Sequence, residues 1–127
     1  MKFTVSSKAL KNVTSLGIIK ANISQFYYRS NVAQITATQD ALKINIEASG
    51  IMTEMTLKGS GDEDTTKSVM IECAKFKNLI DSIDNDIITL EFIEGGIYVH
   101  AGRSKFAIPQ LMDTNDEVLK LSTLYHN

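Results

Sequence analysis

The residues that most readily act as nucleophiles or acid–base groups are few in this sequence: one cysteine, Cys73, and two histidines, His100 and His126. The start of a predicted helix would stabilise a Cys73 thiolate, but no suitably spaced histidine is present to act as its base. We therefore interpret Cys73 as a small buried apolar residue and each histidine as structural or solvated. These residues predict no catalytic site, and we expect that the protein is not an enzyme.

The acidic run at residues 62–64 is the other candidate for chemistry, because clustered carboxylates can bind a metal ion. It lies in GSGDEDTTK at 59–67, which lacks the glycine turn and ligand spacing of a calcium loop. The GSG at 59–61 also lacks the lysine and the following helix of a phosphate-binding loop. The stretch has no apolar residue and predicts a mobile, solvated acidic loop. We expect no metal ion and no cofactor.

Lysines are concentrated in two predicted helical stretches, residues 7–20 and 73–83. These lysines are Lys8, Lys11, Lys20, Lys75 and Lys77. With Asp81 as the only acid, the stretches carry +3 and +1, which leaves −6 for the rest of a chain whose net charge is −2. Neutralisation of phosphates by lysine is the sequence-independent part of DNA binding. Exposed helices are also often lysine-rich for solubility alone, so the charge pattern leaves both interpretations open.

The segments that would position these lysines alternate between strand and helix patterns. MKFTV alternates like a strand, Ser6 or Ser7 can cap the helix that follows, and Gly17 is expected to weaken or end that helix. The strands predicted next cover residues 25–38, 42–48 and 50–59. In the first predicted strand and the helix after it, we assign Val5, Leu10 and Val13 to the core.

The same order restarts at residue 67. KSVMIE predicts a strand, CAKFKNLIDSI a helix that is apolar on one side, and DIITLEFIE another strand. The Gly95-Gly96 pair predicts a hairpin. IYVHAGRSKFAI then predicts two strands bent or broken near Gly102, and Pro109 ends the last one because proline cannot donate to a ladder.

Both halves therefore have the predicted order strand, helix, strands. The segment VSSKALKNV at 5–13 is also similar to IECAKFKNL at 71–79, 66 residues later. A unit that recurs in phase favours duplication over coincidence. We predict an α+β fold built from a duplicated βαβββ unit, with its two helices on one face of antiparallel sheets. The predicted domain covers residues 1–112, with repeats at about 1–60 and 66–110, and residues 113–127 form a linker or tail.

Length and composition limit the class of protein. The 127 residues, 43% hydrophobic and 22% charged, fit one globular domain. No apolar run approaches the roughly 20 residues that cross a bilayer, and the N-terminus lacks the apolar region of a secretion signal. One cysteine excludes an intramolecular disulfide. We expect a soluble cytoplasmic protein without a membrane partner.

Four segments, in this order, resemble the bacterial sliding clamp, the DNA polymerase III beta subunit, in its N-terminal clamp domain. They are MKFTV with its capped helix, SNVAQITA, IECAKFKNLIDSI and GRSKFAIPQL. The resemblance covers nearly the whole chain. It implies a non-catalytic processivity factor for DNA replication, in which helices line a ring around duplex DNA and sheets form the outer wall. Such a ring is opened by a clamp loader and tethers the replicative DNA polymerase.

The resemblance also assigns roles to individual residues. In a ring, the five helix lysines become candidate DNA-binding residues that make loose, sequence-independent phosphate contacts, as sliding requires. The last strand of the first clamp domain joins a neighbouring subunit and closes the homo-oligomer. The candidate subunit-interface residues are Arg103, Lys105, Phe106 and Ile108. The alternative for the two apolar members is ordinary core, because they share a face of the strand.

Departures from the family pattern keep a second function open. The family usually has three domains, whereas this chain has one, so residues 112–127 are either a linker to a further domain or a native tail. Asp81 stands where the family often has a basic residue, and the loop after the first helix lacks an arginine that points at DNA. A divergent clamp from a phage or mobile element would fit. The alternative is a clamp-like protein-interaction module that no longer encircles DNA.

Overall fold

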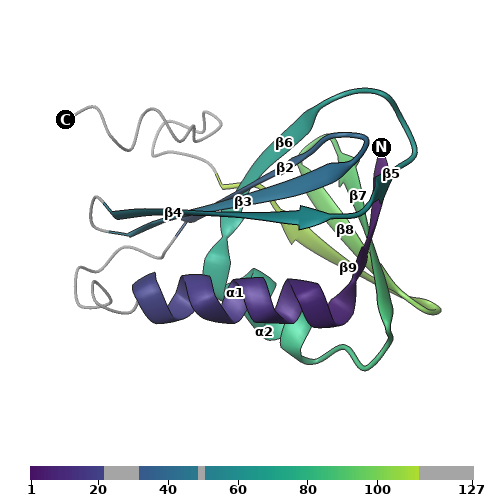
Figure 1. Cartoon of the computed structure of the whole chain (residues 1–127). Helices are drawn as coiled ribbons and strands as arrows, with labels where there is room; N and C mark the ends of the chain where they lie inside the picture. The colour runs from purple at the N-terminus through teal and green to yellow at the C-terminus, as the bar shows by residue number, and fades with distance from the viewer. Residues whose placement is uncertain (22–31, 49–50, 112–127) are drawn as a thin grey trace.

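The computed structural model describes residues 1–21, 32–48 and 51–111 of the chain. Over these ranges the chain forms two helices and two antiparallel sheets, and both helices lie on the same side of the sheets (Figure 1). In chain order the elements are β1 (Lys2–Ser6), α1 (Ser7–Ala21), β2 (Val32–Ala37), β3 (Ala41–Ala48), β4 (Ile51–Lys58), β5 (Ser60–Gly61), β6 (Lys67–Glu72), α2 (Cys73–Asp81), β7 (Ile87–Ile93), β8 (Gly96–Ala101) and β9 (Ser104–Pro109).

The two halves of the chain exchange a strand. One sheet has the order β5-β1-β7-β8-β9 and the other the order β4-β3-β2-β6. The first strand of each half therefore lies in the sheet of the other half: Phe3 of β1 is opposite Leu90 of β7, and Ile71 of β6 is opposite Ala33 of β2. This element order confirms the predicted α+β fold with a duplicated βαβββ unit and both helices on one face.

The registers define how the two halves correspond. The helices begin 66 residues apart, as the sequence echo predicts. Val5 pairs with Ile88, and its counterpart Ile71 pairs with Ala33, so Ala33 and Ile88 are equivalent although only 55 residues apart. The sequence offset between equivalent residues falls from 66 at the helix starts to 55 at these strands because the first half has the longer helix and the longer connection to its next strand. On this correspondence β3 matches β8, and β4 matches β9.

Helix α1 starts at the predicted cap and continues past the predicted end. The backbone N–H of Ala9 donates to Ser6 Oγ at 3.3 Å, which confirms Ser6 as the capping residue. Of the two outcomes expected at Gly17, the end of the helix is wrong, because α1 continues to Ala21. A glycine costs a helix about 1 kcal/mol, which burial of an apolar face offsets: Leu10 is fully buried on that face.

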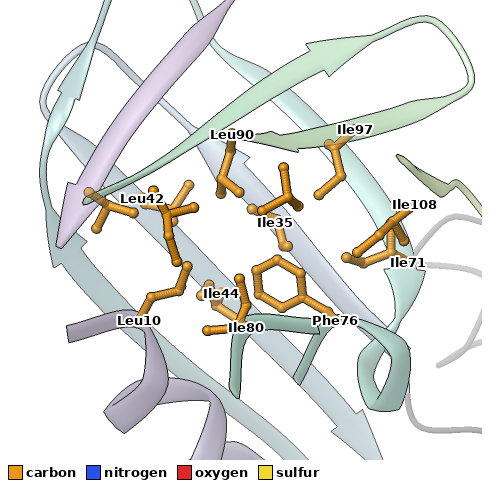
Figure 2. Packing of buried hydrophobic residues seen from close by; sticks show 14 of the residues in the cluster. Leu10, Ile35, Leu42, Ile44, Ile71, Phe76, Ile80, Leu90, Ile97 and Ile108 are labelled. Atoms are coloured by element: carbon orange, nitrogen blue, oxygen red, sulfur yellow. The ribbon is translucent and has the colours of Figure 1, made fainter. Parts of the chain in front are cut away.

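A single apolar core fills the space between the sheets and the helices (Figure 2). It takes alternate residues from the strands, as period-two patterns require, and one face of each helix. Fully buried members with large side chains include Phe3, Leu10, Ile35, Leu42, Ile44, Ile71, Phe76, Ile80, Ile88, Leu90 and Ile97. The predicted core residues Val5 and Leu10 are buried, and Val13 packs against the cluster while partly exposed.

The stretch 59–67 is more ordered than the sequence predicts. Ser60 and Gly61 form the short strand β5 against β1. Asp62 then binds both backbone groups of Lys2 in the first strand: its Oδ1 accepts from Lys2 N at 2.8 Å, and its N–H donates to Lys2 O at 2.9 Å. Glu63 Oε2 lies 3.1 Å from the N-terminal ammonium. The predicted solvation is confirmed for residues 62–64, which are exposed, but the prediction of a loop is wrong for Ser60 and Gly61, which pair with the edge of β1.

The second half has the turns that its glycines predict. The hairpin between β7 and β8 turns at Gly95, where φ is 90°, and that between β8 and β9 turns at Gly102, where φ is 58°. Positive φ angles of this kind favour glycine. Strand β9 ends at Pro109 as predicted. Within the described ranges, no helix is long and apolar enough to cross a membrane, and no cluster of three His, Cys, Asp or Glu side chains is placed to hold a metal ion.

The core gives a matched test of this packing. Ile80 of α2 is fully buried, whereas Ile87 of β7 is 53% exposed. We expect Ile80→Ala to lower the free energy of unfolding by about 2–5 kcal/mol, because it leaves a cavity. Ile87→Ala should cost less than about 1 kcal/mol. Urea unfolding followed by far-UV circular dichroism measures both, and equal losses would contradict the packing described here.

Candidate nucleic-acid interface and subunit edge

The helices that carry the predicted lysines are neighbours in space. α1 and α2 pack against each other and run along one side of the molecule, below the sheets in Figure 1. Each follows directly on an exchanged strand, so the exchange brings the two helix starts to the same side. Four of the five lysines lie where side chains are described. Lys20 lies near the end of α1, in a stretch where only the backbone is described.

Two of these lysines are exposed to solvent. Lys8 lies in the first turn of α1 and is exposed. The side chain of Lys75 in α2 is 63% exposed, and its Nζ lies 3.7 Å from Glu72 Oε2. An exposed ion pair at this distance contributes little to stability. Both ammonium groups are therefore accessible to a negatively charged partner on this side.

Lys11 has a structural role that the sequence did not reveal. Its Nζ donates to Ile83 O at 2.5 Å, 72 residues along the chain. Ile83 follows the C-cap of α2, Ser82, where backbone carbonyls lack helical partners and a cation is favoured. The bond joins α1 to the end of α2. Lys11 thus links the two helices, and its ammonium group is less accessible to an external ligand.

Lys77 is paired within its own helix. Its ammonium forms an ion pair with Asp81, one turn later, and only 22% of its side chain is exposed. The spacing of four residues is visible in the sequence and could have revealed this pair. Asp81 therefore offsets the charge of Lys77. The predicted lysines divide into two accessible residues, two engaged residues and Lys20.

The predicted interface residues lie at the outer edge of the five-stranded sheet. Arg103 in the turn before β9 and Lys105 in β9 are exposed. Lys105 Nζ lies 4.4 Å from the centroid of the Tyr98 ring, a cation–π distance. The two apolar residues divide: Ile108 is 4% exposed and belongs to the core, whereas Phe106 is 39% exposed. Of the two, only Phe106 offers an apolar surface at the edge.

A polar cluster covers the outer face of this sheet beside β9. His100 Nε2 lies 2.8 Å from Glu91 Oε1, so the ring N–H donates to the carboxylate across β7 and β8. This hydrogen bond lowers the pKa of Glu91, and the nearby charges of Lys2 and Lys105 act in the same direction. The His100 ring also meets Tyr98 edge to face, with centroids 6.3 Å apart. His100 is therefore structural, as predicted.

Cys73 does not have the environment of a nucleophile. Its side chain is 1% exposed. Burial raises the pKa of the thiol to about 11, although the charge of Lys77 opposes the shift. A thiol with this pKa is protonated at neutral pH. The interpretation of Cys73 as a small buried residue is confirmed.

No protein-family model matches the sequence, and no curated protein matches it. Solved structures do. The Helicobacter pylori beta clamp bound to a DNA ligase peptide matches with a TM-score of 0.74 and 18% identity, over 94% of this chain and 32% of that chain. This chain has the fold of a bacterial beta clamp domain.

A sliding clamp of a second organism gives the same result. The DNA polymerase sliding clamp of Pseudomonas aeruginosa matches with a TM-score of 0.69 and 21% identity, over 94% of this chain and 32% of that chain. The resemblance seen in four sequence segments is thus confirmed for the fold. This chain spans about a third of the length of the clamp chains that it matches.

The His100–Glu91 hydrogen bond gives a prediction on pH dependence. Because the folded pKa of Glu91 lies below its unfolded value of about 4.3, its contribution to stability is present above that pH. The contribution is lost as the pH falls through the folded pKa. In His100→Phe, we expect the pKa of Glu91 to rise towards about 4.3 and this acid dependence to weaken.

Carbon-detected NMR of the Glu91 carboxylate measures this pKa. Tyr98→Phe is the matched control, since it keeps the ring beside His100 and leaves the hydrogen bond intact. An unchanged Glu91 pKa in His100→Phe would show that the hydrogen bond is not the main cause of the shift.

Proposed function

We propose that this chain is a domain of a DNA sliding clamp, a processivity factor that encircles duplex DNA and tethers the replicative DNA polymerase. The observation that carries the proposal is the pair of packed helices, which presents exposed lysines on one side of a beta clamp fold. In a ring these helices face the DNA and the sheets form the outer wall. The proposed role is non-catalytic and cytoplasmic, and the complete clamp would be loaded by a clamp loader.

The accessible charges suit a weak contact with phosphates. Lys8 and Lys75 are the lysines best placed to reach DNA, because Lys11 and Lys77 are engaged within the chain. Each phosphate neutralised releases condensed counterions, so a site with few such contacts binds weakly and loses affinity with salt. No base is read by lysine ammonium groups that touch phosphates only. Weak contacts without sequence preference allow a ring to move along the duplex.

The edge strand β9 is the proposed contact with a neighbouring domain. Among the described strands β9 pairs with β8 alone, so its other side can add a strand to the sheet. Phe106 supplies an exposed apolar side chain, while Arg103 and Lys105 supply positive charge beside it. Ile108 supports this edge from the core and does not itself form the contact surface. This assignment keeps three of the four predicted interface residues at the surface.

A clamp-like protein-interaction module is the second candidate. Of the four helix lysines whose side chains are described, Lys11 and Lys77 are engaged within the chain, Asp81 offsets Lys77, and the whole chain has a net charge of −2. On this alternative the exposed side of the helices is only solvated. DNA binding by the chain distinguishes the two candidates.

The DNA contact predicts a specific salt dependence. For Lys8→Gln combined with Lys75→Gln, we expect weaker binding to duplex DNA and a slope of log K against log salt reduced by about 2. Fluorescence anisotropy of a labelled duplex over a series of salt concentrations measures both quantities. Lys67→Gln is the matched control, because Lys67 is exposed at the start of β6, away from the helices.

Two results would count against the clamp. The first is equal slopes for the double variant and for Lys67→Gln, since binding would then be a general property of surface charge. The second is an absence of DNA binding at low salt, which would favour the interaction module. Retention on nicked circular DNA, followed by loss when the circle is cut, would show encirclement directly.

A further inference from the structure

The last residue of α2 is a carboxylate that opposes the helix dipole. Asp81 ends this helix, and the last turn contains no basic residue. Backbone carbonyls give a helix C-terminus a partial negative charge, so an anion is unfavourable there. A lysine four residues before an acid is also the less favourable order for an ion pair on a helix. The Asp81 carboxylate therefore lies where helix stability alone would disfavour it.

Other groups already stabilise this end of α2. The backbone N–H of Ser82 donates to Leu79 O at 3.1 Å, and Ser82 Oγ donates to the same carbonyl at 2.6 Å. Lys11 Nζ donates to Ile83 O and brings a positive charge from α1 to the helix end. The end of α2 therefore has its hydrogen bonds and its cation without Asp81.

The effect of Asp81 falls on a lysine of the same helix. Lys77 forms an ion pair with Asp81, and only 22% of the Lys77 side chain is exposed. Lys75, the other lysine of α2, is 63% exposed, and its Nζ lies 3.7 Å from Glu72 Oε2. The two lysines thus differ in availability because Asp81 holds its lysine closely, whereas Glu72 holds its lysine loosely. A carboxylate is an anion, as a phosphate is, and both form charge-assisted hydrogen bonds with an ammonium group.

We propose that Asp81 limits the affinity of the helix pair for DNA by occupying Lys77 in place of a phosphate. A phosphate can take Lys77 only by displacing Asp81, which then lies unpaired beside another anion. Because one anion replaces another, Lys77 adds little to the release of counterions and little to affinity. The inference rests on the proposed function, in which DNA is the ligand of these helices. It makes Asp81 a residue that sets affinity and not one that supports the fold.

Binding of Asp81→Asn to a labelled duplex, followed by fluorescence anisotropy over a salt series, tests this role. We expect about threefold tighter binding at low salt. The slope of log K against log salt should become steeper by about 1, because Lys77 becomes a further phosphate contact. Asp81→Glu keeps the carboxylate and should bind like the unmodified chain. In a Lys77→Gln background, Asp81→Asn should lose most of its effect, since the two residues act as a pair.

Glu72→Gln is the matched control for the loss of one acid beside a lysine of α2. Its pair with Lys75 is long and exposed, so we expect a smaller change in affinity and in slope than for Asp81→Asn. Equal changes in slope for the two variants would overturn the proposal, because any lost acid would then have the same effect. Full tightening by Asp81→Asn in the Lys77→Gln background would overturn it as well.

Urea unfolding separates this role from a structural one. We expect Asp81→Asn to unfold at the same urea concentration as the unmodified chain or at a higher one, because an anion leaves the helix C-terminus. A lower midpoint together with unchanged DNA binding would show that the ion pair serves the fold, and the proposal would be wrong.

The outcomes for Asp81 and for the proposed function can be told apart. If the unmodified chain binds DNA but Asp81→Asn changes neither affinity nor slope, the role of Asp81 is wrong and the clamp proposal stands. If only Asp81→Asn binds, the role of Asp81 is supported and the DNA contact proposed for the unmodified chain fails. If neither binds at low salt, both proposals fail.

Discussion

The rest of this structure depends on the exchange of one strand between the two halves of the chain. β1 pairs with β7 and β6 pairs with β2, so each half supplies the strand that completes the other sheet. Phe3 and Ile71, both fully buried, are delivered to the common core by these exchanged strands. Neither half can bury its apolar face alone. The duplicated unit therefore folds as one domain with one core, not as two small ones.

The exchange also explains why one lysine on the helix side stabilises the fold whereas others remain accessible to a ligand. Each helix begins at the residue after an exchanged strand, so both helices start from the junction of the two halves and pack together. Packing brings Lys11 to the carbonyl of Ile83 at the end of α2. A cation that stabilises a helix end is held in one geometry and is less available to a phosphate. Lys8 and Lys75, which lie outside this contact, retain the accessible charge.

Local patterns in the sequence predicted most elements, because period-two and one-sided helical patterns report which face of a segment is buried. The alternation of LKINIEA and of DIITLEFIE corresponds directly to buried positions in β3 and β7. The strand exchange could not be predicted in this way, since a pairing between distant strands leaves no local periodicity. β5 was missed for the same reason: its two residues are ordered by β1 and by Asp62, not by their own apolar content.

The sequence could predict which residues belong to the candidate site, but not which of their side chains are accessible to a ligand. Lysines on one helix pair could be counted, but the partner of Lys11 lies 72 residues away and only the fold reveals it. Phe106 and Ile108 share a face of β9, and their alternation gives both the same expectation. The structure separates them because Ile108 lies opposite Ile97 and is covered by the core, whereas Phe106 is nearer the open start of the strand.

The same exchange that closes the core also creates the open edges. The exchanged strands β1 and β6 pair with β7 and β2 of the other half, and the last strands, β9 and β4, each pair with one strand only among those described. Pro109 ends β9, and Lys105 lies over the Tyr98 ring instead of extending along the edge. Proline and lysine are the residues by which proteins limit promiscuous edge pairing. An edge that ends in Pro109 and carries an exposed lysine is protected against promiscuous pairing, while Phe106 keeps one apolar side chain at its surface.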